Sequence, residues 1–195
     1  MVYATLFSAV KTYLARPNLP EGDFSAILMG FEGDLQRALR THDRNIVRGQ
    51  FTQVANDPFL PLPINFVGII GLYYNGVAVP QFPADMREDA AAGGYIQKGA
   101  CLELFPTPVE DTLYRMDYYG SLPPLVPTES ASTNWVLTLY PDVYLYGCLR
   151  EAAVYLRDDE RLGQWAAELD RRMQSLAITG WGQGVATAPR VRMAA

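Results

Sequence analysis

Histidine and cysteine are almost missing from this 195-residue sequence, which contains one His and two Cys. His42 has no cysteine or second histidine near it in the chain, which argues against a zinc site. No serine stands in a Gly-x-Ser-x-Gly motif with which His42 could form a catalytic triad. Cys101 and Cys148 form no Cys-x-x-Cys pair and are typical of buried free thiols. We therefore expect neither a metal nor a cofactor.

A long apolar run is also missing. The most apolar stretch, 135–149, is interrupted by Pro141, Asp142 and several tyrosines, so it is a poor candidate for a membrane span. The N-terminus has no basic stretch followed by a long apolar run, so no signal peptide is expected. The glycine clusters at 93–94 and 180–184 lack the strand-to-helix context of a phosphate-binding loop. These absences argue against a membrane protein and against nucleotide binding.

Basic side chains are fewer than acidic ones. The 16 basic side chains face 21 acidic ones, a net charge of −5, which argues against nucleic acid as the main partner. Residues 85–160 carry 5 basic and 13 acidic side chains, a net charge of −8, whereas residues 161–195 carry 5 basic and 2 acidic ones, a net charge of +3. This segregation favours head-to-tail contact between copies or a basic tail that reaches an acidic partner. Ordinary scatter of surface charge would give the same counts.

Apolar periodicity predicts two helices near the N-terminus. Leu6, Val10 and Leu14 recur at helical spacing within a helix of about 4–16, which Pro17 ends. A second helix, at about 23–41, is expected to begin with Asp23 as its cap. Its apolar face consists of Phe24, Ile27, Phe31, Leu35 and Leu39, and its polar face mostly of Glu32, Gln36, Arg37 and Arg40.

Residues of about 45–119 are rich in proline and glycine and carry short β-type patterns. The apolar run from Ile64 to Tyr73 is followed by Asn75-Gly76, which is a hairpin signal. Alternating apolar and polar side chains indicate further strands. These strands are expected at 77–79, 95–97, 101–105 and 113–118.

Helical patterns return in the last third of the chain. The region 134–157 is predicted to hold a short helix capped by Thr133 or Asn134 and a longer one that starts at Pro141. A last helix, at about 160–177, carries apolar side chains three to four residues apart. These are Leu162, Trp165, Leu169, Met173 and Leu176.

The final residues, 179–195, contain several Gly and Pro and no acidic side chain, which predicts an extended C-terminal arm. Taken together, the patterns predict an α+β but mainly α fold. We expect a helical bundle with a β-rich insertion at about 45–119, in which residues 1–178 form one domain and 179–195 form the arm.

The region 134–157 is dense in aromatic side chains and carries no set of catalytic groups. The aromatics occupy more than one helical face, whereas a helix with one wet side carries its apolar residues on a single stripe. They are therefore either core residues of a lone domain or, in part, contacts with another chain. The candidates are Trp135, Tyr140, Tyr144, Tyr146 and Tyr155.

Paired carboxylates leave one route to catalysis open, because a glycosidase needs only two of them. The acids of the strand region are most simply residues of strand faces and turns, and the later acidic run suits the N-terminus of the last helix. The two sets are Glu103, Glu110, Asp111 and Asp117, and the contiguous Asp158, Asp159 and Glu160.

Several short blocks follow one another in a recognisable order along most of the chain. They are Phe31-Glu32 with Leu35, Leu62-Pro63-Ile64-Asn65-Phe66, Leu102-Glu103-Leu104, Asp117-Tyr118-Tyr119, Thr133-Asn134-Trp135, and Tyr140-Pro141-Asp142 onward to Asp158-Asp159. In this order they resemble the head-to-tail adaptor (connector) proteins of tailed bacteriophages, of the short-tailed-phage type. One departure is Asn65, where the family's Leu-Pro-x-Asp-Phe pattern has an aspartate.

The resemblance implies a structural protein without an active site. Such adaptors form a homo-oligomeric ring, typically of about twelve copies, under the portal. The ring extends the DNA channel, through which DNA passes without sequence-specific binding, and offers an attachment surface for tail or nozzle proteins. The protein would be assembled in the host cytoplasm and reside at the head–tail junction of the virion, with no membrane involved.

Within this picture we infer roles for two groups of residues, which the family's pattern does not itself assign. The aromatics Trp135, Tyr140, Tyr144, Tyr146 and Tyr155 are expected to form the helical core and contacts between subunits. Because C-terminal arms of such adaptors often clasp the portal, a second group is expected to bind it. This group is Trp181, Arg190 and Arg192.

Two alternatives from other classes stay open. A phage-associated peptidoglycan hydrolase would use acids such as Glu103 and Asp117, and would clear cell-wall suspensions in a turbidity assay. A monomeric ligand-binding module would stay monomeric and would have an ordered C-terminus.

Overall fold

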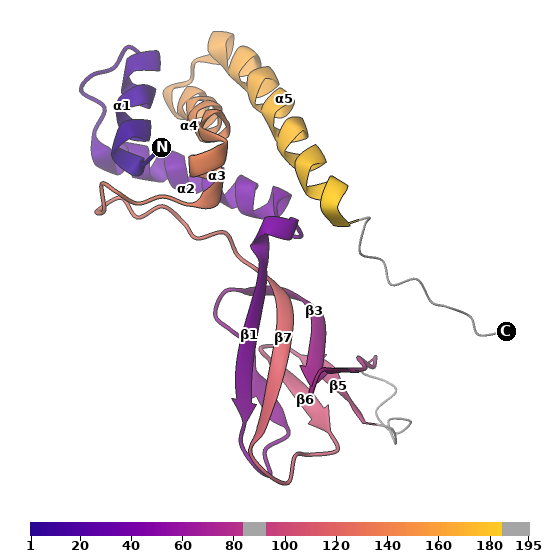
Figure 1. The fold of residues 1–195 in the computed structure, drawn as a ribbon. Coiled ribbons are helices and arrows are strands. Elements are labelled where there is room, and N and C mark those ends of the chain that lie inside the picture. The colour runs from indigo at the N-terminus through magenta and orange to yellow at the C-terminus, as the bar shows by residue number, and fades with distance from the viewer. Residues whose placement is uncertain (84–92, 185–195) are drawn as a thin grey trace, which may run out of the picture. The chain divides into compact units, whose positions relative to one another are not determined.

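The computed structural model describes the backbone of residues 1–83 and 93–184, with side chains as far as Leu176. The chain divides into two compact units. Residues 1–43 and 122–195 form the first, here called the helical unit, and residues 44–121 form the second, the strand unit. Figure 1 shows the helices and strands of the two units.

The helical unit contains five α-helices in its described residues. They are α1 (Tyr3–Tyr13), α2 (Glu21–Ala38), α3 (Trp135–Leu139), α4 (Pro141–Leu156) and α5 (Asp159–Gly184). Helix α2 begins two residues before Asp23, so the prediction that Asp23 caps it is wrong. Pro20 is the capping residue, and Glu21 and Asp23 lie in the first turn, where the helix dipole favours acids.

A break at Tyr140 separates α3 from α4. As predicted, Asn134 caps α3: its side-chain oxygen accepts a hydrogen bond from the backbone N–H of Leu137. Tyr140 is non-helical, with φ −131° and ψ 60°. Pro141 then opens α4, where its fixed φ suits the first helical position and its missing N–H costs nothing. The break changes the direction of the chain without a loop.

Helix α4 ends at Arg157, which adopts a left-handed conformation with φ 55° and caps the helix through its own N–H. Helix α5 follows after Asp158 and continues to Gly184. The expected extended arm from residue 179 is therefore wrong for its first six residues, which are helical. The remainder, 185–195, lies outside the described residues.

One apolar cluster fills the helical unit. It draws on α1, α2, α3, α4 and α5 and on the segment that precedes α3. Three rings, Tyr3, Phe7 and Phe24, stack where α1 meets α2. Helices α2 and α4 cross where Gly147 faces Phe31, and a Cβ atom at this glycine would lie 2.2 Å from the ring. The glycine therefore lets the two helices approach closely.

The strand unit consists of two antiparallel sheets. One has the order β1-β7-β3-β4 and the other β2-β6-β5. The short 3₁₀ turn η1 (Asp43–Asn45) precedes them. The strands are β1 (Ile46–Gln53), β2 (Phe59–Pro61), β3 (Phe66–Tyr74), β4 (Val77–Val79), β5 (Gly94–Lys98), β6 (Cys101–Phe105) and β7 (Thr112–Gly120).

Side chains from both sheets form the core of the strand unit, which is smaller than the core of the helical unit. Its buried members are Leu60, Leu72, Tyr95, Leu102, Leu104, Tyr114, Met116 and Tyr118. The hairpin between β3 and β4 turns at Asn75-Gly76, as predicted, and both residues have positive φ (50° and 81°). Strand β1 was missed by the sequence analysis.

The predicted fold class, a mainly α helical bundle with an inserted β region, is wrong. Besides its helices, the described chain has seven strands in two antiparallel sheets with a core of their own. Strands were expected between 45 and 119, but they were treated as an insertion into a mainly helical fold, whereas they pair into two sheets with an apolar interior.

Candidate functional site

One of the predicted aromatic residues, Tyr144, is the centre of a buried polar network. This side chain is fully buried on α4, and its ring meets Phe31 of α2 edge-on at 5.4 Å between centroids. Its hydroxyl donates to Glu32 Oε1 at 3.0 Å and accepts from Asn134 Nδ2 at 2.6 Å. The same Glu32 oxygen accepts from the backbone N–H of Leu125 at 2.9 Å. The network joins α2, α3, α4 and the segment before α3.

Burial sets the electrostatics of this network. Glu32 is 9% exposed, and burial raises its pKa, although the hydrogen bonds from Leu125 and Tyr144 offset part of the rise. Burial, followed by the nearby Glu32, also raises the pKa of Tyr144 and the pKa of the Cys148 thiol. The tyrosine and the thiol therefore stay neutral at any physiological pH. Such a network holds helices together and has no group activated for chemistry.

The sequence analysis placed Glu32 and Gln36 on a polar helix face, and so missed both. The structure buries Glu32, and Gln36 Oε1 accepts from the backbone N–H of Leu122 at 3.1 Å. Both side chains bind the segment that returns to the helices, about 90 residues later in the chain. No local pattern carries this information, because the two partners are backbone groups.

Tyr146 is half-buried and lies where α4 faces α5. The guanidinium of Arg172 covers its ring at 3.9 Å and forms an ion pair with Asp142 at 3.0 Å. Arg172 also pairs with Glu168 on its own helix, and this hydrogen bond lowers the pKa of the Glu168 carboxyl. Tyr146 is thus used inside one chain, as part of the contact between α4 and α5.

Trp135 and Tyr140 pack together at the α3–α4 break. Their rings meet edge-on at 6.4 Å, and the imidazole of His42 lies 4.9 Å from the Trp135 ring. Both aromatic side chains are half-buried and pack against the helical core. The solitary histidine is thus an aromatic packing partner in this unit.

Tyr155 differs from the other four aromatics. It is 53% exposed on α4, and its neighbour Val154 is 57% exposed. Met29 of α2 is more exposed still, at 73%. The structure therefore divides the predicted set: Tyr144 is core, Trp135, Tyr140 and Tyr146 are half-buried within the unit, and Tyr155 faces outward. We call Val154 and Tyr155 the α4 apolar pair.

The predicted arm residues fall at or beyond the end of the described side chains. Trp181 lies within the bounds of α5, but its side chain is outside the described part of the chain. Arg190 and Arg192 lie outside the described residues altogether.

The candidate carboxylates are held by basic partners. Glu103 is buried on β6 and pairs with Lys98 Nζ at 2.6 Å. Asp117 is buried on β7, and its Oδ1 lies 3.0 Å from Arg48 Nε and 3.6 Å from Arg115 Nε. The two acids belong to different sheets of the strand unit. Of the acidic run, Asp158 caps the start of α5 by accepting from the N–H of Arg161.

Other chemical sites were sought among the described residues. No three His, Cys, Asp or Glu side chains come together there in a way that could hold a metal ion. Cys101 and Cys148 are both free thiols. A hollow of about 440 Å³ in the strand unit is lined mainly by apolar groups, with Glu110 as an acidic member. Its walls include Tyr74, Val79, Phe105, Pro106 and Tyr114.

Within the described part of the chain, no helix combines the length and the apolar character that crossing a bilayer requires.

Comparison with known proteins gives a match over almost the whole chain. The model of the family described as "SU10 adaptor protein" matches residues 1–193. The chain belongs to the SU10 adaptor protein family. A search of curated proteins returned no significant match. The resemblance to phage head-to-tail adaptors, drawn from the order of short blocks, is confirmed at the level of the family.

Family membership gives the aromatic network its setting. The matched range includes both the helical and the strand unit, so the sheets belong to the adaptor protein itself. The polar network around Tyr144 and the α4–α5 contact lie inside one adaptor chain. Among the predicted aromatics, Tyr155 is the one whose side chain is more than half exposed.

Proposed function

We propose that this SU10-family adaptor is a structural virion protein that forms an oligomeric ring at the head–tail junction. The ring docks on the portal, extends the DNA channel and offers an attachment surface for tail or nozzle proteins. The observation that carries the proposal is the α4 apolar pair. Val154 and Tyr155 are more than half exposed on a helix whose other face is built into the core. Exposed tyrosine beside an aliphatic residue is typical of protein interfaces.

The charge of the chain supports a channel through which DNA passes without being held. The net charge is −5, and acids outnumber bases most strongly between residues 85 and 160. A wall with this balance repels phosphates and gives no sequence-specific contacts. The ring is proposed to have about twelve subunits, as the resemblance to phage adaptors implies, and one repeated heterologous contact would close it.

The C-terminal residues are proposed to reach the portal. Residues 161–195 carry a net charge of +3, in contrast to the acidic region before them. Arg190 and Arg192 supply bidentate donors for carboxylates, and Trp181 supplies one large apolar anchor. In this proposal residues 1–178 form the body of the adaptor and 179–195 form its portal-binding segment.

Ring formation is testable with the full-length protein and its portal. Negative-stain images of the mixture should show ring-shaped complexes. Replacing Val154 and Tyr155 with serine together should abolish the rings and leave the melting temperature nearly unchanged, because neither side chain belongs to the core. Tyr13→Ser is the matched control, since Tyr13 is a 52% exposed helical tyrosine outside the proposed contact. Rings that persist in the double variant would rule out the α4 apolar pair as an interface.

The portal-binding segment is tested separately. The double variant Arg190→Gln and Arg192→Gln should bind the portal more weakly in a sedimentation assay, and more weakly still at higher salt. Unchanged affinity would remove the segment from the proposal. If the wild-type protein stays monomeric at every portal concentration, this result counts against the ring itself and favours a monomeric binding module.

The sequence left a peptidoglycan hydrolase open as an alternative. Glu103 and Asp117 are each paired with a basic side chain, which is the arrangement of structural carboxylates. Clearing of a cell-wall suspension that is lost in Glu103→Gln or Asp117→Asn would nevertheless establish an enzymatic role.

A further inference from the structure

Among the described strands, β1 is an edge of its sheet. It pairs with β7 in an unbroken register over all eight residues, from Ile46↔Tyr119 to Gln53↔Thr112. It lies at the end of the sheet order, so β7 is its one neighbour among the described strands (Figure 1). In an antiparallel pair every second residue directs its N–H and C=O away from the partner. About half of the backbone N–H and C=O groups of β1 therefore point away from β7.

The other three sheet edges are blocked, each in a different way. Strand β4 is three residues long and is followed by Pro80. Strand β2 is also three residues long and ends in Pro61. Strand β5 is flanked by Gln81, which bridges to Tyr95. Proteins normally protect edge strands by shortness, proline, bulges or covering segments, and β1 has none of the first three.

The side chains of β1 determine which side chains an added strand, here called the guest, must carry. Val47 and Phe51 point to the core of the strand unit and pack against it, whereas Arg48 and Gln50 are exposed on the opposite face. The absence of a side chain at Gly49 leaves room for the Phe51 ring beside it. A guest that extends the sheet past β1 must therefore alternate, with apolar side chains on the core side and polar ones on the outer side.

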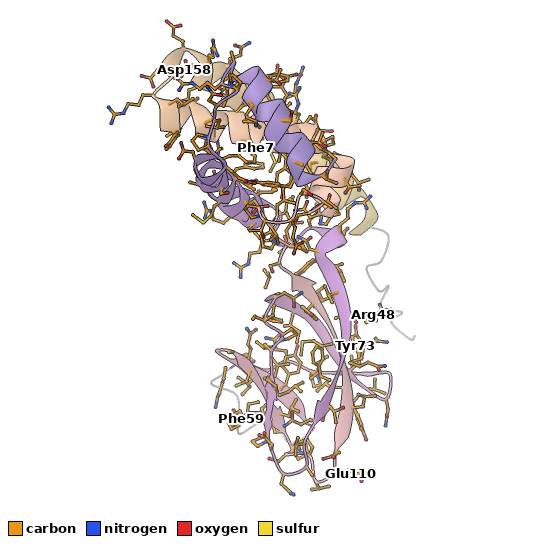
Figure 2. The ribbon with its side chains drawn as sticks, turned by 90° about the vertical axis from the view of Figure 1, so that its left-hand side faces the viewer. Phe7, Arg48, Phe59, Tyr73, Glu110 and Asp158 are labelled. Atoms are coloured by element: carbon orange, nitrogen blue, oxygen red, sulfur yellow. The ribbon has the colours of Figure 1, made fainter. Side chains whose placement is uncertain are left out.

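Charge on the outer face selects an acidic guest. Asp117 lies opposite Arg48 on β7 and also faces Arg115, so two guanidinium groups share one carboxylate. Arg115 is fixed by stacking on the Tyr73 ring at 4.1 Å. Figure 2 shows Arg48 and Tyr73 near one another on the strand unit. Arg48 donates hydrogen bonds to both oxygens of Asp117, and Arg115 lies 3.6 Å from the same carboxylate, so the two guanidinium groups share one unmatched positive charge. The Arg48 side chain is 68% exposed at the edge itself.

We propose that β1 is a docking edge for an extended segment of a partner protein, which adds to the sheet as a further strand. The segment carries an acidic side chain opposite Arg48 and apolar side chains at the alternate positions beside Val47 and Phe51. Backbone hydrogen bonds supply the affinity and the Arg48 pair supplies the register. A protein segment is favoured over nucleic acid because the face carries one surplus charge and is flanked by apolar groups.

The sequence of β7 provides the probe, because this strand already pairs with β1 in the required pattern. Its inward residues are Tyr114, Met116 and Tyr118, and its Asp117 lies opposite Arg48. A synthetic peptide of residues 112–120 is titrated into the full-length protein, and the backbone amides are followed by NMR. Shifts should concentrate in residues 46–53, with slowed hydrogen exchange at alternate amides.

Matched peptides and variants separate the two parts of the proposal. A peptide with Met116→Pro should not bind, because it lacks a donor and breaks the strand. A peptide with Asp117→Asn should bind about threefold more weakly to the wild-type protein. That difference should vanish in the protein variant Arg48→Gln and persist in the control Arg37→Gln on α2, which is a second exposed arginine.

Three results would overturn the proposal. The first is the absence of shifts in residues 46–53 at millimolar peptide. The second is a concentration-dependent dimer of the protein alone whose contacts are those same amides, because the edge would then belong to a second copy. The third is a shift of the β1 amide signals when a short DNA duplex is added, if that shift is lost in the variant Arg48→Gln. The peptide with Asp117→Asn leaves the protein unaltered, so the test does not depend on how a variant folds.

Discussion

The helical unit and the strand unit are held together in different ways. The helical unit joins segments far apart in sequence through a large apolar core and a buried polar network in which Glu32, Tyr144 and Asn134 take part. The strand unit relies on ladders between strands and on a smaller core shared by two sheets. The helical unit turns most of its aromatics inward, whereas the strand unit leaves an eight-residue edge open. Each unit thus has a core of its own, and what each exposes differs: an apolar pair on α4 in the helical unit and a backbone edge in the strand unit.

This contrast shows why a chain can be rich in aromatics and still expose few of them. Four of the five predicted contact aromatics are engaged by named partners within the unit. Tyr144 is engaged by Glu32, Tyr146 by Arg172, and Trp135 and Tyr140 by each other. The apolar surface left for partners in the aromatic region is small and is confined to positions such as Val154 and Tyr155. Recognition therefore depends on a few exposed residues.

The largest expected effect comes from the core of the strand unit. Leu72→Ala removes a fully buried side chain between the sheets and should lower the free energy of unfolding of that unit by about 4 kcal/mol. Tryptophans 135, 165 and 181 all belong to the helical unit. Tryptophan fluorescence should therefore keep its melting midpoint while the strand signal in circular dichroism melts earlier. Ile70→Ala, at a 44% exposed site on the same strand, is the control. Coincident early melting by both probes would show that the units unfold as one.

The crossing of α2 and α4 comes next. Gly147→Val places a side chain where the Phe31 ring lies and should cost about 3 kcal/mol, measured by urea unfolding followed by tryptophan fluorescence. Gly163→Ala on α5 is the control, because a Cβ there meets nothing within 4 Å. That change should stabilise the helical unit by up to about 1 kcal/mol. Equal effects at the two glycines would contradict the close packing at Gly147.

Removing one hydroxyl should have a smaller effect. Tyr144→Phe deletes the group that donates to Glu32 and accepts from Asn134, and should cost about 2 kcal/mol in thermal or urea unfolding. Tyr155→Phe removes an exposed hydroxyl and should change stability by less than about 0.5 kcal/mol. If the two substitutions cost the same, the buried network contributes nothing specific.

The smallest effect is one of pH. Glu32→Gln keeps an oxygen that can accept from Tyr144 and Leu125 but removes the charge. Burial raises the pKa of Glu32 in the folded protein. The folded wild type therefore has its highest stability relative to the variant below the ordinary glutamate pKa, about 4.3. Its stability relative to the variant should fall as pH rises from the ordinary glutamate pKa through the raised one. Urea unfolding at several pH values between 4 and 8 checks this, and a constant difference would contradict it.

Helix starts and turns could be predicted from the sequence where a side chain acts on the backbone next to it. Asn134 marks the start of α3, Pro141 marks the start of α4 and Asn75-Gly76 marks the hairpin, because capping and turn chemistry involve neighbours in sequence. The burial of Glu32 and the pairing of β1 were not predictable in the same way. Both depend on residues some 70 to 90 positions away, and Gly49 and Arg48 weaken the apolar alternation of β1. The predicted fold class was wrong because strand pairing depends on residues that are this far apart in the sequence.

The pairing of β1 with β7 has a consequence for how such chains diversify. The strand by which the chain enters the unit and the strand by which it leaves are adjacent, and Ile46 lies directly opposite Tyr119. Opposite residues of an antiparallel pair are about 5 Å apart, so entry and exit form a single narrow stem. A stem of this width can be closed by a tight turn or can carry a larger domain. Replacing residues 47–118 by a tight turn would therefore leave unchanged the distance between the two points at which the chain enters and leaves the strand unit.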